Sequence, residues 1–179
     1  MTSPGSHVAN PDGLWLDDLA VGMQFHSPVV LLREEDIIAF AEQFDPQAFH
    51  LSATAARDSF FEGLAASGWH TAALSMKLLA QALPLATGII GKGVEIEWPS
   101  PTRPNDELRI VAQIDTITPS KSRPDRGSIT VGYQTLNQSG DIRQRARITL
   151  IGWKRHVGTQ ATAPGAESGE KAIKRGESR

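Results

Sequence analysis

The strongest constraint on the fold is a segment with apolar side chains on nearly every helical face, residues 69–83 (WHTAALSMKLLAQAL). A helix that is apolar almost all round is buried, because none of its faces favours water. Pro84 and Gly88 follow this segment and are typical of a helix end. We therefore predict a long central helix that the rest of the chain has to cover.

The chain after this helix is predicted to form a sheet. Four runs alternate between apolar and polar residues, which is the pattern of strands with one buried face. They cover residues 94–98, 107–117, 128–137 and 142–153. Turn sequences rich in Pro, Asn, Asp and Gly separate them, so the later strands are expected to pair antiparallel. One buried helix and a long antiparallel sheet predict an α+β fold in which the sheet wraps around the helix.

The chain before the central helix is predicted to be mixed. Residues 22–32 are strand-like, and residues 34–44 carry three acidic residues followed by apolar residues at helical spacing. Pro46 ends that predicted helix, because the residue before a proline is disfavoured in the α conformation. A loop and a short helix over residues 53–60 are expected to follow.

A length of 179 residues favours a single domain. Residues 1–13 and 158–179 hold too few large apolar side chains to offset the entropy of ordering them, so we expect both to be disordered around a domain at residues 14–157. The chain has no cysteine, no apolar stretch long enough for a membrane helix and no signal-peptide pattern. These features predict a soluble cytoplasmic protein.

The net charge of −2 conceals an uneven distribution. Residues 1–100 hold 4 basic and 12 acidic residues, whereas residues 101–156 hold 10 basic and 5 acidic ones. Arg143, Arg145 and Arg147 alternate along one predicted strand and so share a face. That face is either the solvated side of the sheet or a surface for anionic groups such as phosphates. Nucleic-acid binding is not indicated, because the basic residues are not interleaved with aromatic ones.

Asp45 and His50 are the main candidates for chemistry. They stand in the segment FDPQAFH, where the imidazole follows the carboxylate by five residues. The two side chains can meet only if the loop folds back, and they would then be able to share acid–base work on a water molecule. The alternative is a helix-terminating Asp-Pro turn with a packed histidine. The spacing alone leaves both interpretations open.

Gly68 is the second candidate, because it stands where a loop enters the central helix. The backbone N–H groups at a helix N-terminus lack partners and carry partial positive charge, and a residue without Cβ lets a ligand oxygen approach. The position could be an oxyanion hole, or a plain first turn with Ser67 as the cap. His70, two residues further on, is possible either as a lining residue or as a residue that supports the site from behind its lining.

Other chemistries lack a motif. No serine lies in a G-x-S-x-G sequence, and no histidines and carboxylates have metal-ligand spacing. The glycines of residues 88–93 follow a helix and precede a strand, which is the reverse of a dinucleotide-binding loop. We therefore predict no metal and no redox cofactor.

With these residues in view, the chain resembles the MaoC-like dehydratases, close to the (R)-specific enoyl-CoA hydratases. FDPQAFHLSATAA is similar to the family's catalytic loop, and LAASGWHTAALSMKLL is similar to its small-residue segment and central helix. The resemblance covers residues 22–153. It implies a single hot-dog fold, at least a homodimer, and a CoA thioester of fatty acid metabolism as the substrate.

The resemblance also implies residue roles. Asp45 and His50 would add water to a 2,3-unsaturated acyl thioester, or remove it, as a hydro-lyase does. The N–H of Gly68 would hold the thioester oxygen, with Ser67 and Gln47 as binding residues. The chain departs from the family pattern at Gln47, where Asn is usual, at Ala48, where a second proline is usual, and at Ser52, which is often acidic.

Two other functions remain open. A hot-dog thioesterase would use a carboxylate to direct water at the thioester carbonyl, but that carboxylate usually lies on or beside the central helix. Residues 69–83 contain no Asp or Glu. A non-catalytic hot-dog protein that binds acyl thioesters is the other alternative.

Overall fold

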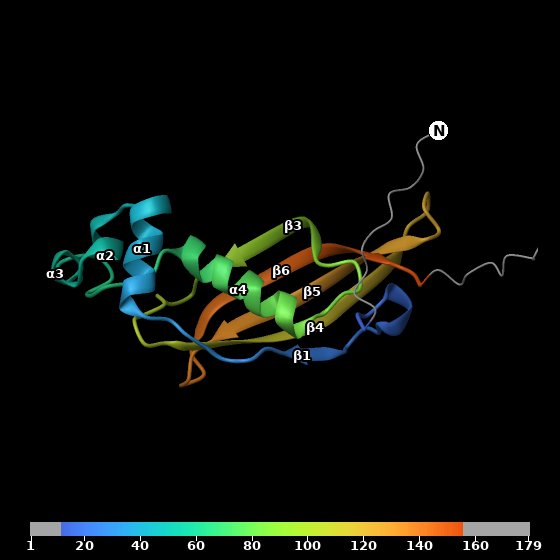
Figure 1. The fold of residues 1–179 in the computed structure, drawn as a ribbon, viewed down its shortest axis with the longest axis horizontal. Helices are drawn as coiled ribbons and strands as arrows, with labels where there is room; N and C mark the ends of the chain where they lie inside the picture. The colour runs from blue at the N-terminus through green and yellow to red at the C-terminus, as the bar shows by residue number, and fades with distance from the viewer. Residues whose placement is uncertain (1–11, 156–179) are drawn as a thin grey trace, which may run out of the picture.

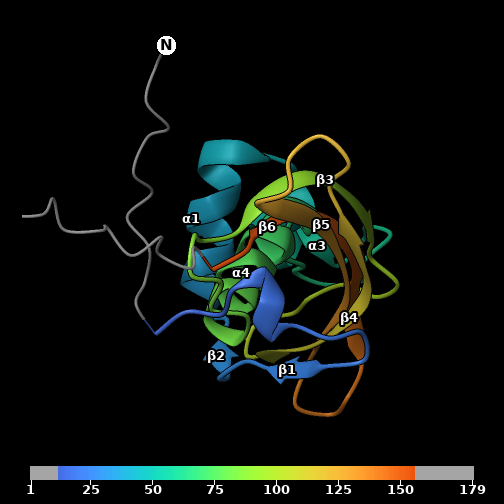
Figure 2. The ribbon, with the colours of Figure 1, turned by 90° about the vertical axis from the view of Figure 1, so that its right-hand side faces the viewer.

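The structure is a computed structural model that describes residues 12–155, and the expectations for residues 1–11 and 156–179 lie outside this part. One antiparallel sheet curves around a long helix, α4 (Gly68–Ala82) (Figures 1 and 2). The expected domain boundary at residue 14 falls just inside the described part, where Gly13 is buried against Ala86. The α+β hot-dog-like fold predicted from the sequence is confirmed.

Each strand of the sheet pairs with its neighbours in antiparallel register. The order is β1-β4-β5-β6-β3, and β2 adds a short pairing with β4. The strands are β1 (Gln24–His26), β2 (Val30–Leu31), β3 (Ile90–Glu97), β4 (Glu107–Pro119), β5 (Arg126–Leu136) and β6 (Ile142–Trp153). Alternate side chains of β4, β5 and β6 point toward α4, so the core forms between the inner face of the sheet and the helix.

The central helix is less enclosed than its sequence predicts. Leu78 and Leu79 are buried in the core, and Thr71 and Ser75 are buried against the sheet side. On the opposite side, Trp69 is 63% exposed. The expectation of a helix buried on nearly every face is therefore wrong for the single chain, because the sheet covers only one side of α4 (Figure 2).

Three helices gather at the N-terminal end of α4 (Figure 1). They are α1 (Glu34–Phe44), α2 (Ala48–Leu51) and α3 (Ala53–Ala56). The predicted helix at 34–44 is confirmed, whereas α2 lies where a loop was expected and α3 is shorter than residues 53–60. Helices of a single turn have no apolar period to detect in a sequence. No helix of the described residues is long and apolar enough to cross a membrane.

Candidate active site

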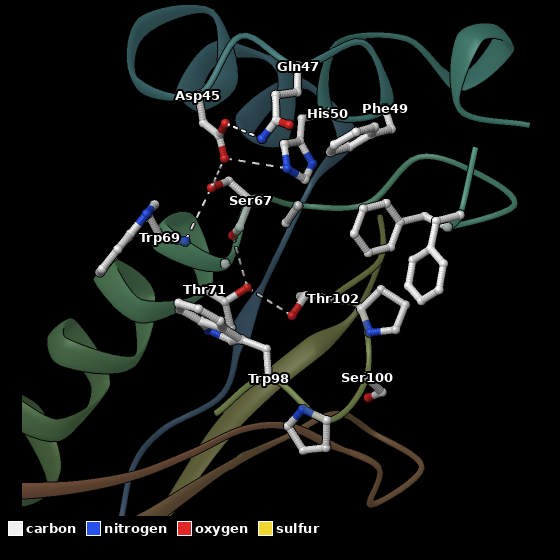
Figure 3. A pocket seen from close by; sticks show the side chains of 16 residues that line it. Asp45, Gln47, Phe49, His50, Ser67, Trp69, Thr71, Trp98, Ser100 and Thr102 are labelled. Atoms are coloured by element: carbon white, nitrogen blue, oxygen red, sulfur yellow. Dashed lines mark hydrogen bonds and ion pairs between the residues drawn. The ribbon is translucent and has the colours of Figure 1, made fainter. Parts of the chain in front are cut away.

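A pocket of about 610 Å³ opens at the N-terminal end of α4 (Figure 3). Four stretches of chain form its walls: the loop after α1 with α2, the turn after α3, the start of α4, and the loop after β3. Its polar lining residues are Asp45, Gln47, His50, Ser67, Thr71, Ser100 and Thr102. Its aromatic ones are Phe49, Phe60, Phe61, Trp69 and Trp98. The pocket thus joins a polar end at Asp45 and His50 to largely apolar walls.

Asp45 and His50 meet in this pocket, because the loop after α1 folds back into α2. His50 Nε2 lies 3.4 Å from Oδ2 of Asp45. The same oxygen accepts a 2.6 Å hydrogen bond from the Ser67 hydroxyl, and Oδ1 accepts one of 2.7 Å from the amide of Gln47. Burial raises the pKa of Asp45, but these two hydrogen bonds and the nearby His50 outweigh it and hold the pKa below its usual value. Asp45 is therefore a carboxylate at neutral pH.

The proton on neutral His50 is fixed by its neighbour. Nδ1 of His50 lies 2.7 Å from the carbonyl oxygen of Ala65. A carbonyl can only accept, so Nδ1 carries the hydrogen and Nε2 is left with a lone pair. His50 is 4% exposed, and its ring makes an edge-on contact with Phe49. Nε2 of His50 and the Asp45 carboxylate are thus two neighbouring acceptors in one pocket, an arrangement that can hold a water molecule and take a proton from it.

The start of α4 brings Ser67 and Gly68 to the same place. The Ser67 hydroxyl accepts from the N–H of Trp69 and so caps the helix while it donates to Asp45. Within residues 12–155 no acceptor bonds the N–H of Gly68, which leaves this donor for a ligand oxygen. Glycine is favoured at this position for a second reason as well. A Cβ at residue 68 would lie 2.9 Å from two carbons of the Trp98 indole.

The departures from the family loop have structural roles. Gln47 takes part in the site by donating to the Asp45 carboxylate. Ser52 caps α3 by accepting a 3.3 Å hydrogen bond from the N–H of Ala55. Its hydroxyl therefore serves the local helix. Ala48 begins α2, the turn that carries His50.

His70 lies outside the pocket that Asp45 and His50 share. Its ring stacks on Phe40 of α1 at 4.5 Å, and it lines a separate cavity between α1 and α4. Nδ1 is buried and has no hydrogen-bond partner among residues 12–155. Burial lowers the pKa of His70, and the Asp36 carboxylate opposes this only in part. Of the two possibilities left open for His70, a place in the lining of the Asp45–His50 pocket is therefore wrong, because the helix turns its side chain toward α1.

The predicted arginine face is only partly present. Arg143 is 11% exposed and its guanidinium bonds Asp106 and Ser100, so it is not available on an open surface. Arg145 and Arg147 are exposed, but each lies opposite a glutamate of β3, Glu97 and Glu95 respectively. Arg147 also pairs with Asp115 at 3.3 Å. This surface is charge-matched, which favours the interpretation as the solvated side of the sheet.

Several site residues were not predicted from the sequence. Phe60 and Phe61 reach the pocket from the turn after α3, and Trp98 and Thr102 reach it from the loop after β3. Thr102 bonds Thr71 of α4 through their hydroxyls at 2.9 Å. The only sequence signal for the loop after β3 was its proline-rich turn. Among residues 12–155, no three His, Cys, Asp or Glu side chains are grouped so that they could hold a metal ion.

The curved sheet and the central helix, with the Asp45–His50 pair in a pocket at the helix N-terminus, define a hot-dog-like protein. The family model described as MaoC like domain matches residues 19–136. The chain therefore belongs to the MaoC-like dehydratase family, which confirms the resemblance seen in the sequence.

Several known proteins are similar to this chain in sequence or structure. A MaoC-like dehydratase from Rhodospirillum rubrum is 54% identical, with a TM-score of 0.79 over 80% of this chain and 99% of that one. The uncharacterized protein YdeM of Bacillus subtilis (strain 168) is 32% identical over 126 residues, which are 69% of this chain and 87% of that protein. The (R)-hydratase PhaJ1 from Pseudomonas aeruginosa shares the fold, with 22% identity and a TM-score of 0.67 over 80% of this chain and 88% of that one.

Proposed function

We propose that this protein adds water to a 2,3-unsaturated acyl-CoA thioester, or removes it from the 3-hydroxyacyl product. The observation that carries the proposal is the pairing of His50 Nε2 with the Asp45 carboxylate, 3.4 Å apart and facing one pocket. The family and the 54% identical MaoC-like dehydratase support dehydratase chemistry. The apolar walls suit an acyl chain.

Hydration in this site proceeds through one water molecule. Asp45 and His50 hold the water, and Nε2 accepts a proton as the oxygen bonds C3 of the acyl group. The electron pair of the C2–C3 double bond moves toward the thioester, whose oxygen gains negative charge beside the N–H of Gly68. The proton is then delivered to C2 from the Asp45–His50 pair. Dehydration is the reverse of these steps.

The decisive experiment follows the loss of ultraviolet absorbance when crotonyl-CoA is hydrated. Asp45→Asn and His50→Ala are each expected to lower kcat by about 10²–10⁴, the usual contribution of a positioned acid or base. Arg145→Ala, on the outer face of the sheet, serves as the control. Full activity in either site variant would refute the assignment. Release of free CoA without hydration would identify a thioesterase, and binding without turnover would identify a non-catalytic protein.

The protein also forms a homodimer through the uncovered side of α4 and the adjoining strand β3. The exposed apolar side chains there are Trp69, Met76, Ile90, Val94 and Trp98. β3 is an edge strand of the sheet, and its free edge pairs with no other strand of residues 12–155. Contiguous apolar surface and an open edge are features of subunit contacts.

Light scattering tests the dimer. Met76→Lys and Val94→Asp are expected to shift the mass to that of a monomer. Val29→Asp places a charge on an equally exposed valine away from this patch and should leave the mass unchanged. A monomeric wild type, or variants that remain dimers, would contradict this interface.

A further inference from the structure

We propose that Arg103 is a positioning residue for His50, a role that rests on the proposed function of the Asp45–His50 pair. Arg103 lies in the loop between β3 and β4. Its guanidinium donates to three backbone carbonyls of the turn between α3 and α4. The bonds run to Phe61 at 2.5 Å, Gly63 at 2.8 Å and Leu64 at 3.1 Å. The side chain thereby joins the sheet side of the pocket to the turn that precedes α4.

This turn has a backbone that needs outside support. Glu62 has a φ of 53° and Gly63 a φ of 151°, both in the left-handed region. Glutamate rarely adopts such a φ, because its Cβ then crowds the backbone. The planar guanidinium bonds carbonyls before and after Glu62, so it supports a backbone conformation that a glutamate does not favour.

The supported turn leads directly to the carbonyl that orients His50. Leu64, whose carbonyl Arg103 bonds, is followed by Ala65, whose carbonyl accepts from His50 Nδ1 at 2.7 Å. Ala65 also donates its N–H to the carbonyl of Phe49, the neighbour of His50. A displacement of this segment would move the acceptor of Nδ1 and so change both the orientation of the imidazole and its proton placement.

Arg103 is itself held from the sheet side. Its backbone N–H donates a 2.8 Å hydrogen bond to Asp106. Asp106 is buried and is bonded in turn by Arg143 and Asn137. Thr102, which precedes Arg103, accepts a 2.9 Å hydrogen bond at its carbonyl from the N–H of Ala66. The backbone that carries the Arg103 side chain is therefore held in place, which is what a positioning role requires.

The test compares Arg103→Ala and Arg103→Lys with wild type and with Arg126→Ala. Arg126 bonds Asp125 and lies over the Trp153 ring, remote from the turn, so its removal controls for loss of a guanidinium. Arg103→Ala is expected to lower kcat for crotonyl-CoA about 10- to 100-fold, the scale of a displaced catalytic group, with little change in KM. Lysine should restore little, because one ammonium cannot bond three carbonyls in the same geometry. Added guanidinium ion should rescue the alanine variant in part and should not rescue His50→Ala.

A nitrogen NMR spectrum of the histidine rings shows which ring nitrogen carries the hydrogen, and this readout does not depend on activity. In wild type, neutral His50 should carry its hydrogen on Nδ1 alone, and in Arg103→Ala part of it should move to Nε2. An unchanged kcat would overturn the proposal, as would a lowered kcat with an unchanged His50 spectrum. If the alanine variant does not fold, Arg103→Lys is measured in the same way. An inactive wild type would refute the proposed function, while the spectrum would still decide the role of Arg103.

Discussion

The Ser67 hydroxyl donates a 2.6 Å hydrogen bond to the same oxygen of Asp45 that faces His50 Nε2. Ser67 also caps α4, so one side chain links the start of the central helix to the Asp45–His50 pair. The carboxylate is thereby fixed relative to the N–H of Gly68. Helix, carboxylate and imidazole form one connected unit.

Ser67→Ala should raise the pKa of Asp45. Loss of the hydroxyl removes a bond that favours the charged form of the carboxyl group, and an NMR titration of the Asp45 carboxyl carbon measures the resulting rise directly. Loss of the cap should also lower the free energy of unfolding by about 1 kcal/mol. Ser52→Ala removes the cap of α3 without touching Asp45 and serves as the control. An Asp45 carboxyl titration that is unchanged in Ser67→Ala would contradict the role of Ser67.

Asp45 should also make stability depend on pH. Its pKa is lower in the folded chain than in the unfolded one, so the carboxylate stabilises the fold above the unfolded pKa of about 4. This stabilisation is lost as the pH falls through the folded value. Urea unfolding of wild type should therefore show a steeper loss below about pH 4 than unfolding of Asp45→Asn. Parallel curves for the two proteins would count against a depressed pKa.

The long elements could be predicted from the sequence, because periodicity reports which faces are buried. α1, α4 and β6 lie where their patterns placed them, and Asp45, His50 and Gly68 converge as the motif implied. The misplaced features are those set by tertiary contacts. Arg143 leaves the arginine face because the β5–β6 register shifts between Thr135 and Leu136, which turns it to Asp106.

The unpredicted part of the site has the same cause. Phe61, Trp98 and Arg103 belong to turns, where no periodic pattern signals a role. Their contacts join segments some 40 residues apart, as in the bond from Arg103 to the carbonyl of Gly63. Only the closure of the sheet around α4 brings these segments together.

His70→Phe should remove a pH-sensitive weakness of the fold. His70 has a lowered pKa in the folded chain, so as the pH falls below about 6.5 the unfolded chain takes up a proton that the folded chain does not. Wild-type stability should decline in this range, and the phenylalanine variant, which can keep the stacking on Phe40, should decline less. Thermal unfolding at pH 5 and pH 8 measures the difference, with His26→Phe on the exposed strand β1 as the control. If the stability of wild type and of His70→Phe depends on pH in the same way, His70 is not the source of the loss of stability at low pH.

Gly68→Ala should destabilise the protein through Trp98. The new Cβ would lie 2.9 Å from carbons of the indole, so the ring or the helix start has to move, at a cost of about 1–3 kcal/mol. Gly93→Ala, where nothing lies within 4 Å of the added Cβ, should cost much less. Combining Gly68→Ala with Trp98→Leu removes the clash, so the double variant should lose less stability than the sum of the two single variants. Chemical unfolding of wild type, the two single variants and the double variant gives the four free energies of unfolding. If the losses of the two single variants add up to that of the double variant, Trp98 does not limit the residue at position 68.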